Sequence, residues 1–205
     1  PIELNNPLGG VAVNTWNRSQ VQVKLLIDYS RDYSASRDLA EDIELIATSD
    51  DDEITIEVDY PEAGNENAVN IIASSLEVSL PAGNPVSIRN SFGPVTVTGL
   101  NSSVSITSSF SNIELRQIDG EVSVSNSSGT VYLEQITGEL SVANSFGAIE
   151  AVLIDGEISI SNSYSPITVK KSTGELNIGN SGVIIVNRHQ GDVTAHSSNG
   201  EIEIY

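Results

Sequence analysis

The sequence of 205 residues contains no cysteine, which excludes a disulfide framework and thiol chemistry. Histidine is nearly absent as well, because only His189 and His196 occur and they do not stand in a metal-ligand spacing. No G-x-S-x-G nucleophile elbow is present, and no apolar run approaches the length needed to cross a membrane. These absences predict a protein with no cofactor, no metal centre, no catalytic motif and no transmembrane segment.

Positive charge is also scarce. Nine Lys and Arg stand against 28 Asp and Glu, which gives a net charge of −19. Phosphate binding needs clustered Lys and Arg, so nucleic acid is excluded as a partner, and anionic membrane surfaces are unfavourable. The acidity is compatible with solubility, with cation binding or with a basic partner. Aromatic residues make up only 5% of the chain and apolar residues 39%, so we expect an aliphatic core.

The sequence is instead dominated by an 18-residue repeat, seen most clearly in DGEVSVSNSSGTVYLEQI at 119–136. Four positions of the block, numbered four, six, thirteen and fifteen, are apolar in all seven copies. Position four holds Val86, Val104, Val122, Leu140, Ile158, Leu176 and Val193. Position thirteen holds Val95, Ile113, Val131, Ile149, Ile167, Ile184 and Ile202.

Each block contains two V-x-V or I-x-V pairs, and this alternation is typical of half-buried strands. Turn residues such as N-S-[FSY]-[GS] separate the pairs. One block is too short to bury its own apolar face, so the copies must stack. The sequence therefore predicts an all-β fold, a single-stranded parallel β-helix or β-solenoid with 18-residue coils. We expect a right-handed coil, because parallel crossovers are overwhelmingly right-handed.

We expect a single β-solenoid domain over 1–205. Residues 83–205 are predicted to form seven regular coils, at 83–100, 101–118, 119–136, 137–154, 155–172, 173–189 and 190–205. Residues 1–82 are predicted to form irregular coils of the same body and to act as a cap. This part should contain strands over 1–30, a short helix capped by Ser36, a hairpin from Ile43 to Val58 and a polar loop from Tyr60-Pro61 to Asn67.

Several motifs are shared with a known family. They are Trp16 followed by Val21-Gln22-Val23, Ile54-Thr55-Ile56 ahead of Tyr60-Pro61, Leu76-Glu77-Val78-Ser79-Leu80-Pro81, and Asn90-Ser91-Phe92-Gly93 leading into G-[ED]-[VLI] repeats. With these motifs the chain resembles the bacterial putative-adhesin β-solenoid family, a domain of unknown function common in Bacteroidetes. The resemblance covers nearly the whole chain and is specific for fold rather than activity. It implies an exported protein at the cell surface or in the periplasm and brings no catalytic residues. The start at Pro1 rather than Met is compatible with removal of a leader.

The candidate ligand-binding residues form an aromatic column at position ten of the block: Phe92, Phe110, Phe146 and Tyr164, interrupted by Ser128. If the rings face outward, they offer a stacking surface for sugars or for apolar side chains of a partner. If they face inward, they fill a corner of the coil. The Gly or Ser after each ring indicates a tight bend and favours the corner.

Three further columns have a structural and a functional interpretation. Position eight holds Asn90, Asn126, Asn144, Asn162 and Asn180, with Ser108 and Ser197 in the other coils, and favours hydrogen bonding between coils. Position three holds Glu121, Glu139, Glu157, Glu175 and Asp192, which form a solvated turn or bind calcium. Positions five and seven carry small polar residues such as Ser123 and Ser125, which form a neutral outer face or a glycan-binding surface.

We therefore expect a non-catalytic, exported binding module that recognises a glycan or protein partner along a lateral face. One alternative is a carbohydrate-active enzyme resembling the β-helical polysaccharide lyases or hydrolases, which would need a groove lined by paired carboxylates. Arg89, Arg116 and Arg188 fall at different block positions and do not form one catalytic column. The other alternative is a structural solenoid that assembles through apolar, uncapped ends.

Overall fold

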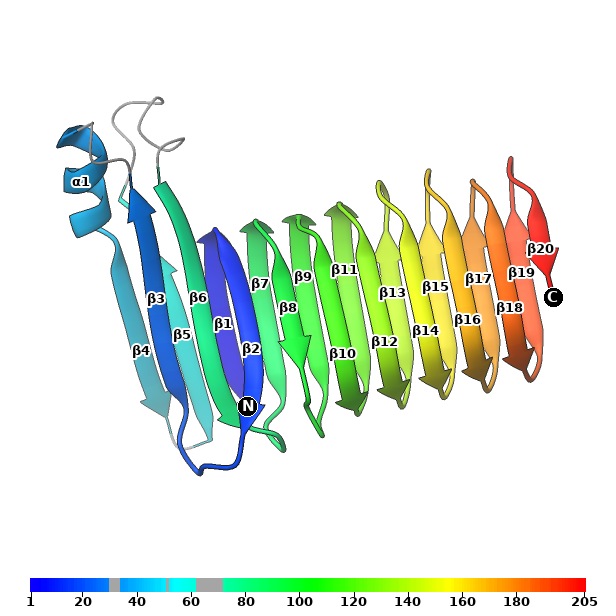
Figure 1. Ribbon diagram of the computed structural model, residues 1–205, viewed down its shortest axis with the longest axis horizontal. Helices are drawn as coiled ribbons and strands as arrows, with labels where there is room; N and C mark the ends of the chain where they lie inside the picture. The colour runs from blue at the N-terminus through cyan, green and yellow to red at the C-terminus, as the bar shows by residue number, and fades with distance from the viewer. Residues whose placement is uncertain (30–33, 51, 62–71) are drawn as a thin grey trace.

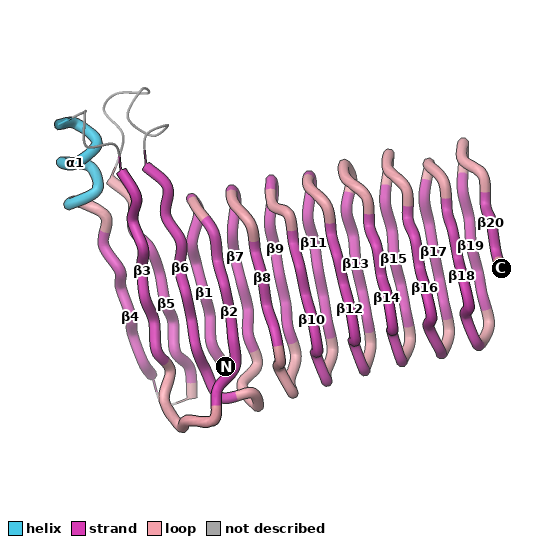
Figure 2. The backbone as a smooth tube through the Cα atoms, in the orientation of Figure 1, coloured by secondary structure: helices cyan, strands magenta, loops and turns pink. Residues whose placement is uncertain are grey.

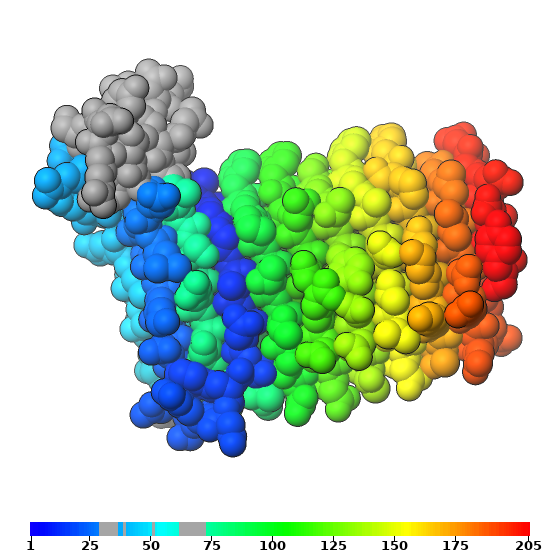
Figure 3. Space-filling model, viewed as in Figure 1, coloured from blue at the N-terminus to red at the C-terminus, as the bar shows by residue number. Residues whose placement is uncertain are grey.

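The computed structural model describes residues 1–29, 34–50, 52–61 and 72–205. These residues form a parallel β-solenoid of two ten-stranded sheets, which lie on opposite sides of an elongated body. From β5 onward the chain passes from one sheet to the other at each turn, so a coil consists of one strand from each sheet (Figures 1 and 2). From residue 83 onward the coils lie in sequence order along the long axis of the body, from green to red in Figure 3.

We call the two sheets A and B. In spatial order, sheet A contains β4 (Glu44–Asp50), β5 (Glu53–Asp59), β1 (Ile2–Leu8), β7 (Val86–Phe92), β9 (Val104–Phe110), β11 (Val122–Ser128), β13 (Leu140–Asn144), β15 (Ile158–Asn162), β17 (Leu176–Asn180) and β19 (Val193–Ser197). Sheet B contains β3 (Gln22–Tyr29), β6 (Ile72–Pro81), β2 (Gly10–Trp16), β8 (Val95–Thr98), β10 (Ile113–Asp119), β12 (Val131–Thr137), β14 (Ile149–Asp155), β16 (Ile167–Thr173), β18 (Ile184–Gln190) and β20 (Ile202–Ile204).

The regular array follows the predicted period. In sheet A, Val122 pairs with Val104 and Leu140, and in sheet B, Val131 pairs with Ile113 and Ile149. Equivalent residues of neighbouring coils therefore lie side by side, which confirms seven coils from 83 onward. Ile167 pairs with Ile184, seventeen residues later, because the coil at 173–189 is one residue shorter than the others.

The space between the sheets is filled by aliphatic columns. Val122, Val131 and Leu133 are at most 1% exposed, and the equivalent side chains of the other regular coils are buried up to Val186. Position eighteen adds Leu100, Ile118, Ile136 and Ile154 to the same core. Toward the C-terminal end, position eighteen is occupied by the polar residues Ser172 and His189. The buried Ser172 hydroxyl lies 2.9 Å from Nδ1 of His189.

The N-terminal strands do not follow sequence order. The coil of β1 and β2 lies between the coil of β5 and β6 and the coil of β7 and β8. The chain therefore passes over the first coil when it continues from β6 to β7, as Figure 1 shows. At the N-terminal end, β3 and β4 run antiparallel to β6 and β5 and form the edge strands of sheets B and A. The hairpin predicted from Ile43 to Val58 is confirmed as β4 and β5.

A short helix, α1 (Ser34–Glu41), lies at this N-terminal end beside β3 and β4 (Figure 1). Ser36 lies inside the helix and not at its cap, so the predicted helix start is two residues late. The part of the predicted polar loop at 62–67 lies outside the described residues. In the described ranges, no helix is long and apolar enough to cross a membrane.

The Tyr60 hydroxyl connects the inserted first coil to its neighbour. It lies 2.6 Å from Asn6 Oδ1 and 2.6 Å from Ser74 Oγ, and it also contacts the carbonyl of Leu8. Ser74 Oγ donates a 2.7 Å hydrogen bond to the same carbonyl. Burial raises the pKa of the Tyr60 phenol above its usual value, and the hydrogen bond with Ser74 opposes this shift.

Candidate functional site

The aromatic column lies at the end of the sheet A strands, where each coil turns toward sheet B. Phe92 and Phe110 are the last residues of β7 and β9 and pair in register. Phe146 and Tyr164 come two residues after the ends of β13 and β15. The parallel pairing between coils therefore places the four side chains along one line on the body.

All four rings project into solvent, with exposed fractions of 49% for Phe92, 57% for Phe110, 53% for Phe146 and 69% for Tyr164. They stack in two pairs. The ring centroids of Phe92 and Phe110 are 5.1 Å apart with an interplanar angle of 8°. Those of Phe146 and Tyr164 are 4.6 Å apart at 7°. The interpretation of the column as an interior corner is therefore wrong.

The corner is occupied by the asparagine column instead. Asn144 is 5% exposed, and its Nδ2 donates to the carbonyl of Gly129 in the preceding coil at 2.9 Å and to that of Gly147 in its own turn at 3.1 Å. Asn162 repeats this arrangement with the carbonyls of Gly147 and Ser165. The structural interpretation of position eight is confirmed. Because these amides close the turn from inside, the residue at position ten lies outside.

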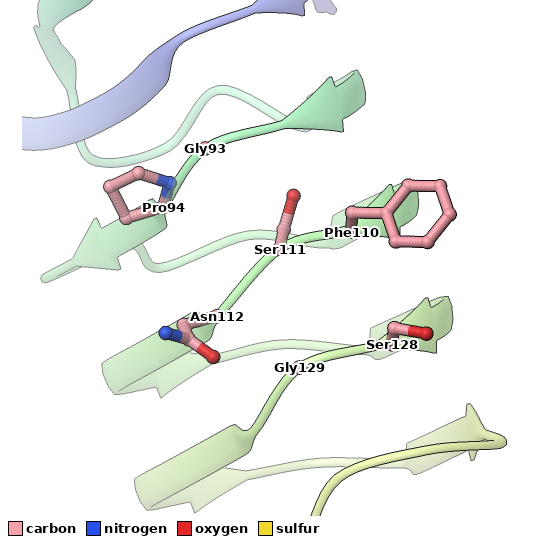
Figure 4. Close-up of a pocket in the computed structure, with 7 residues that line it drawn as sticks. All are labelled: Gly93, Pro94, Phe110, Ser111, Asn112, Ser128 and Gly129. Carbon is pink, nitrogen blue, oxygen red and sulfur yellow. The ribbon is translucent and has the colours of Figure 1, made fainter.

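Ser128 separates the two stacked pairs. It pairs with Phe110 on one side and with Phe146 on the other, so it occupies the place where a fifth ring would join the pairs. A pocket of about 250 Å³ opens beside it. The pocket is lined by Gly93, Pro94, Phe110, Ser111, Asn112, Ser128 and Gly129. Figure 4 shows Phe110 and Ser128 projecting in the same direction, away from the end of the turn that carries Pro94 and Asn112.

The outer face of sheet A next to the aromatic column is uncharged over four coils. Its outward residues are all exposed: Ser105, Thr107, Ser123, Ser125, Ser141, Ala143, Ser159 and Ser161. This confirms that positions five and seven face outward. The acidic column borders the opposite edge of this face, and Glu121, Glu139 and Glu157 are exposed there.

Charged contacts gather on the outer face of sheet B. The Arg116 guanidinium lies 4.7 Å from the ring centroid of Tyr132 and pairs with Glu114 and Glu134. Lys170 pairs with Glu150 at 2.7 Å. Over the four coils from 101 to 172 the two faces of the solenoid therefore differ in chemistry, and sheet A presents the neutral surface beside the aromatic rings.

No family model matches the chain, and no curated protein matches it. Among solved structures, the chain is similar to a protein described as "a putative cell adhesion protein from Clostridium sporogenes ATCC 15579". The two are 13% identical, the match covers 98% of this chain and 92% of that protein, and the TM-score is 0.34. A similarity of this size transfers no function to the chain.

The described part of the chain contains no group of three or more His, Asp or Glu side chains arranged to hold a metal ion. The residues that line the pocket beside Ser128 carry no acidic, basic or imidazole group. The chemistry that this pocket offers is therefore ring stacking and neutral hydrogen bonding.

Sequence reasoning missed the contribution of the turn residues Pro94, Ser111 and Asn112 to the pocket. They occupy positions eleven and twelve of the block, immediately after the aromatic column. In the sequence, these residues stand directly after the interrupted aromatic column, and this adjacency is the pattern that could have indicated a pocket there. However, unless it is known whether the rings point inward or outward, the same pattern is also expected for a tight turn with no pocket.

Proposed function

We propose that this chain is a non-catalytic, exported binding module that recognises a glycan or protein partner along the face that carries the aromatic column. One observation carries the proposal: four large rings are held in stacked pairs on the outside of a rigid sheet. Contiguous exposed apolar surface of this kind marks interaction sites in soluble proteins. Because backbone pairing between coils fixes the rings before binding, little conformational entropy is lost when a ligand docks.

Two observations favour binding over the alternatives. The pocket at the column offers no acid or base for a lyase or hydrolase mechanism, which needs a titratable group in contact with the substrate. The outermost N-terminal strands, β3 and β4, run antiparallel to the coil strands, so this end does not continue the parallel pairing that joins the coils, which disfavours assembly by repeated parallel stacking of ends. Export to the cell surface or periplasm follows from the family resemblance and belongs to the proposal.

The proposed function is tested by a glycan-array screen of the purified chain, with calcium and with chelator. A variant with Phe92, Phe110, Phe146 and Tyr164 all replaced by Ala should lose binding and keep its β circular dichroism, because the rings are exposed. The matched control is Tyr132→Ala, which removes an aromatic ring from the outer face of sheet B.

Binding that is lost only with chelator would move the site to the acidic column. Binding that survives removal of all four rings would contradict the proposed site. A pull-down of candidate protein partners with the same variants extends the test to protein ligands.

A further inference from the structure

The interruption of the aromatic column at Ser128 leaves a gap of one ring, which we call the Ser128 gap and which is bounded by Phe110 and Phe146. Adjacent rings in the column lie 5.1 and 4.6 Å apart. Phe110 and Phe146 are separated by two coils, so a strand spacing of about 4.8 Å places them about 9.6 Å apart. One ring inserted between them would meet both faces at the spacing at which the column itself stacks.

We propose that the Ser128 gap binds one pyranose ring of a neutral oligosaccharide, held between Phe110 and Phe146. The inference rests on the proposed function and adds to it the ligand class and the position of the central subsite. Phe92 and Tyr164 stack on the outer sides of Phe110 and Phe146 and support these two walls of the gap.

The walls and the floor of the gap differ in polarity. Phe110 and Phe146 are more than half exposed and present apolar faces. The floor is Ser128, whose carbonyl accepts a 2.8 Å hydrogen bond from Asn126 and whose hydroxyl has no hydrogen-bond partner within the described ranges. A pyranose has apolar faces and a rim of hydroxyl groups, so it matches both. An aromatic side chain from a protein partner would leave the Ser128 hydroxyl without a hydrogen bond.

The adjoining pocket offers a second polar group. Asn112 Oδ1 accepts hydrogen bonds from the backbone N of Thr130 at 2.9 Å and from its Oγ1 at 3.1 Å. These bonds fix the orientation of the Asn112 amide at the end of the pocket away from the Phe110 and Ser128 side chains (Figure 4), where it extends the polar lining beyond the gap. A few fixed polar groups beside apolar walls are characteristic of small-ligand sites.

The charges select a neutral ligand. The pocket lining carries no ionisable side chain, and the adjoining outer face of sheet A carries Ser, Thr and Ala. The acidic column along the far edge of that face and the net charge of −19 repel uronic acids and sulfated sugars. Among the described residues, the pocket lining contributes no Lys or Arg that would offset this repulsion.

The proposal is tested by a substitution that fills the Ser128 gap with an aromatic ring. Ser128→Phe adds the missing ring, whereas the control, Asn199→Phe, adds a ring at position ten of the last coil, where Asn199 is exposed and remote from the gap. Isothermal titration calorimetry uses neutral tetrasaccharides of glucose, mannose and xylose, with tetragalacturonic acid as the acidic probe and N-acetyltyrosinamide as the aromatic probe. Wild-type protein should bind at least one neutral tetrasaccharide more tightly than the other two probes. Ser128→Phe should weaken that binding at least about tenfold, and Asn199→Phe should leave it unchanged.

A second pair of variants keeps the test decisive if Ser128→Phe does not fold by circular dichroism. Phe146→Ala removes a wall of the gap, and Phe92→Ala removes a ring outside it. The loss of affinity should be at least about tenfold for Phe146→Ala and clearly smaller for Phe92→Ala.

If Ser128→Phe binds the sugar as tightly as wild type or more tightly, the column acts as a flat surface. That result would contradict a sugar site in the Ser128 gap, and the proposed function would still hold. Preference for N-acetyltyrosinamide or tetragalacturonic acid would overturn the ligand class. If wild-type protein binds none of these probes and no glycan on the array, both the gap and the glycan form of the proposed function fail.

Discussion

The side-chain amide of Asn162 donates a 2.9 Å hydrogen bond to the carbonyl oxygen of Gly147, fifteen residues earlier in the chain. A second bond of 2.9 Å reaches the carbonyl of Ser165 in its own turn. One buried amide thus satisfies acceptors of two successive coils. The same contact recurs in neighbouring coils, so the asparagine column holds the turns in register just inside the aromatic column.

Replacing Asn162 tests this role. Asn162→Ala should lower the free energy of unfolding by about 2–3 kcal/mol, because it leaves buried carbonyls without donors and opens a cavity. Asn162→Ser should cost less, since the Ser197 hydroxyl already makes the equivalent 2.9 Å bond to Gly182 in the last coil. Urea denaturation of the three proteins gives the comparison. Equal losses for Ala and Ser would show that side-chain volume, and not the hydrogen bond, determines the stability at this position.

Gly147 cannot accept a side chain. Its φ is +118°, and a Cβ there would lie 2.1 Å from the carbonyl oxygen of Gly129 in the adjacent coil. Gly147→Ala should therefore destabilise the protein by about 3 kcal/mol or more, measured by thermal or urea unfolding. The control is Gly179→Ala, because a Cβ at Gly179 meets no atom within 4 Å. That variant should change stability by less than about 0.5 kcal/mol.

Tyr60 should make stability sensitive to alkaline pH. Its pKa is raised in the folded state by burial, so its contribution is complete below the unfolded value of 10.0 and is lost as pH rises through the folded value. Tyr60→Phe should cost about 1–2 kcal/mol at neutral pH through the lost hydroxyl contacts. Above pH 10 the difference between wild type and Tyr60→Phe should shrink. A difference that stays constant up to pH 12 would contradict the role of the phenol.

Leu153 has a φ of 59°, a left-handed conformation that non-glycine residues adopt at a cost. It is also 41% exposed. Leu153→Asn should stabilise the protein by about 0.5–1 kcal/mol, because Asn tolerates this conformation better than Leu. The same replacement at Val152, whose φ is not positive, should give no gain. A lower melting temperature for Leu153→Asn would show that packing of the Leu side chain outweighs the backbone term.

Much of the fold was predictable because a repeat of strand pairs carries the same information in every copy. The 18-residue spacing of Val104, Val122 and Leu140 predicts that these residues stack, and the structure pairs them. The order of the N-terminal strands was not predictable. Nothing local in β1 or β2 indicates that they pair with β5, β6, β7 and β8, because strand pairing between distant segments depends on the free energy of the whole body. The right-handed sense of the coil stays a prediction from the general rule for parallel crossovers.

The candidate site, like the fold, was predictable from the sequence only in part. The sequence by itself determined the members of the aromatic column and its interruption at Ser128, because residues at one position of a stacked repeat must lie in one line. Only the tertiary structure decided that the rings point outward. Strict alternation from position eight would place position ten inside, yet the buried amide of Asn144 bonds to the carbonyl of Gly147 and fills the corner first. The direction of a ring depends on which neighbouring side chain occupies the interior volume, and that competition is settled by packing.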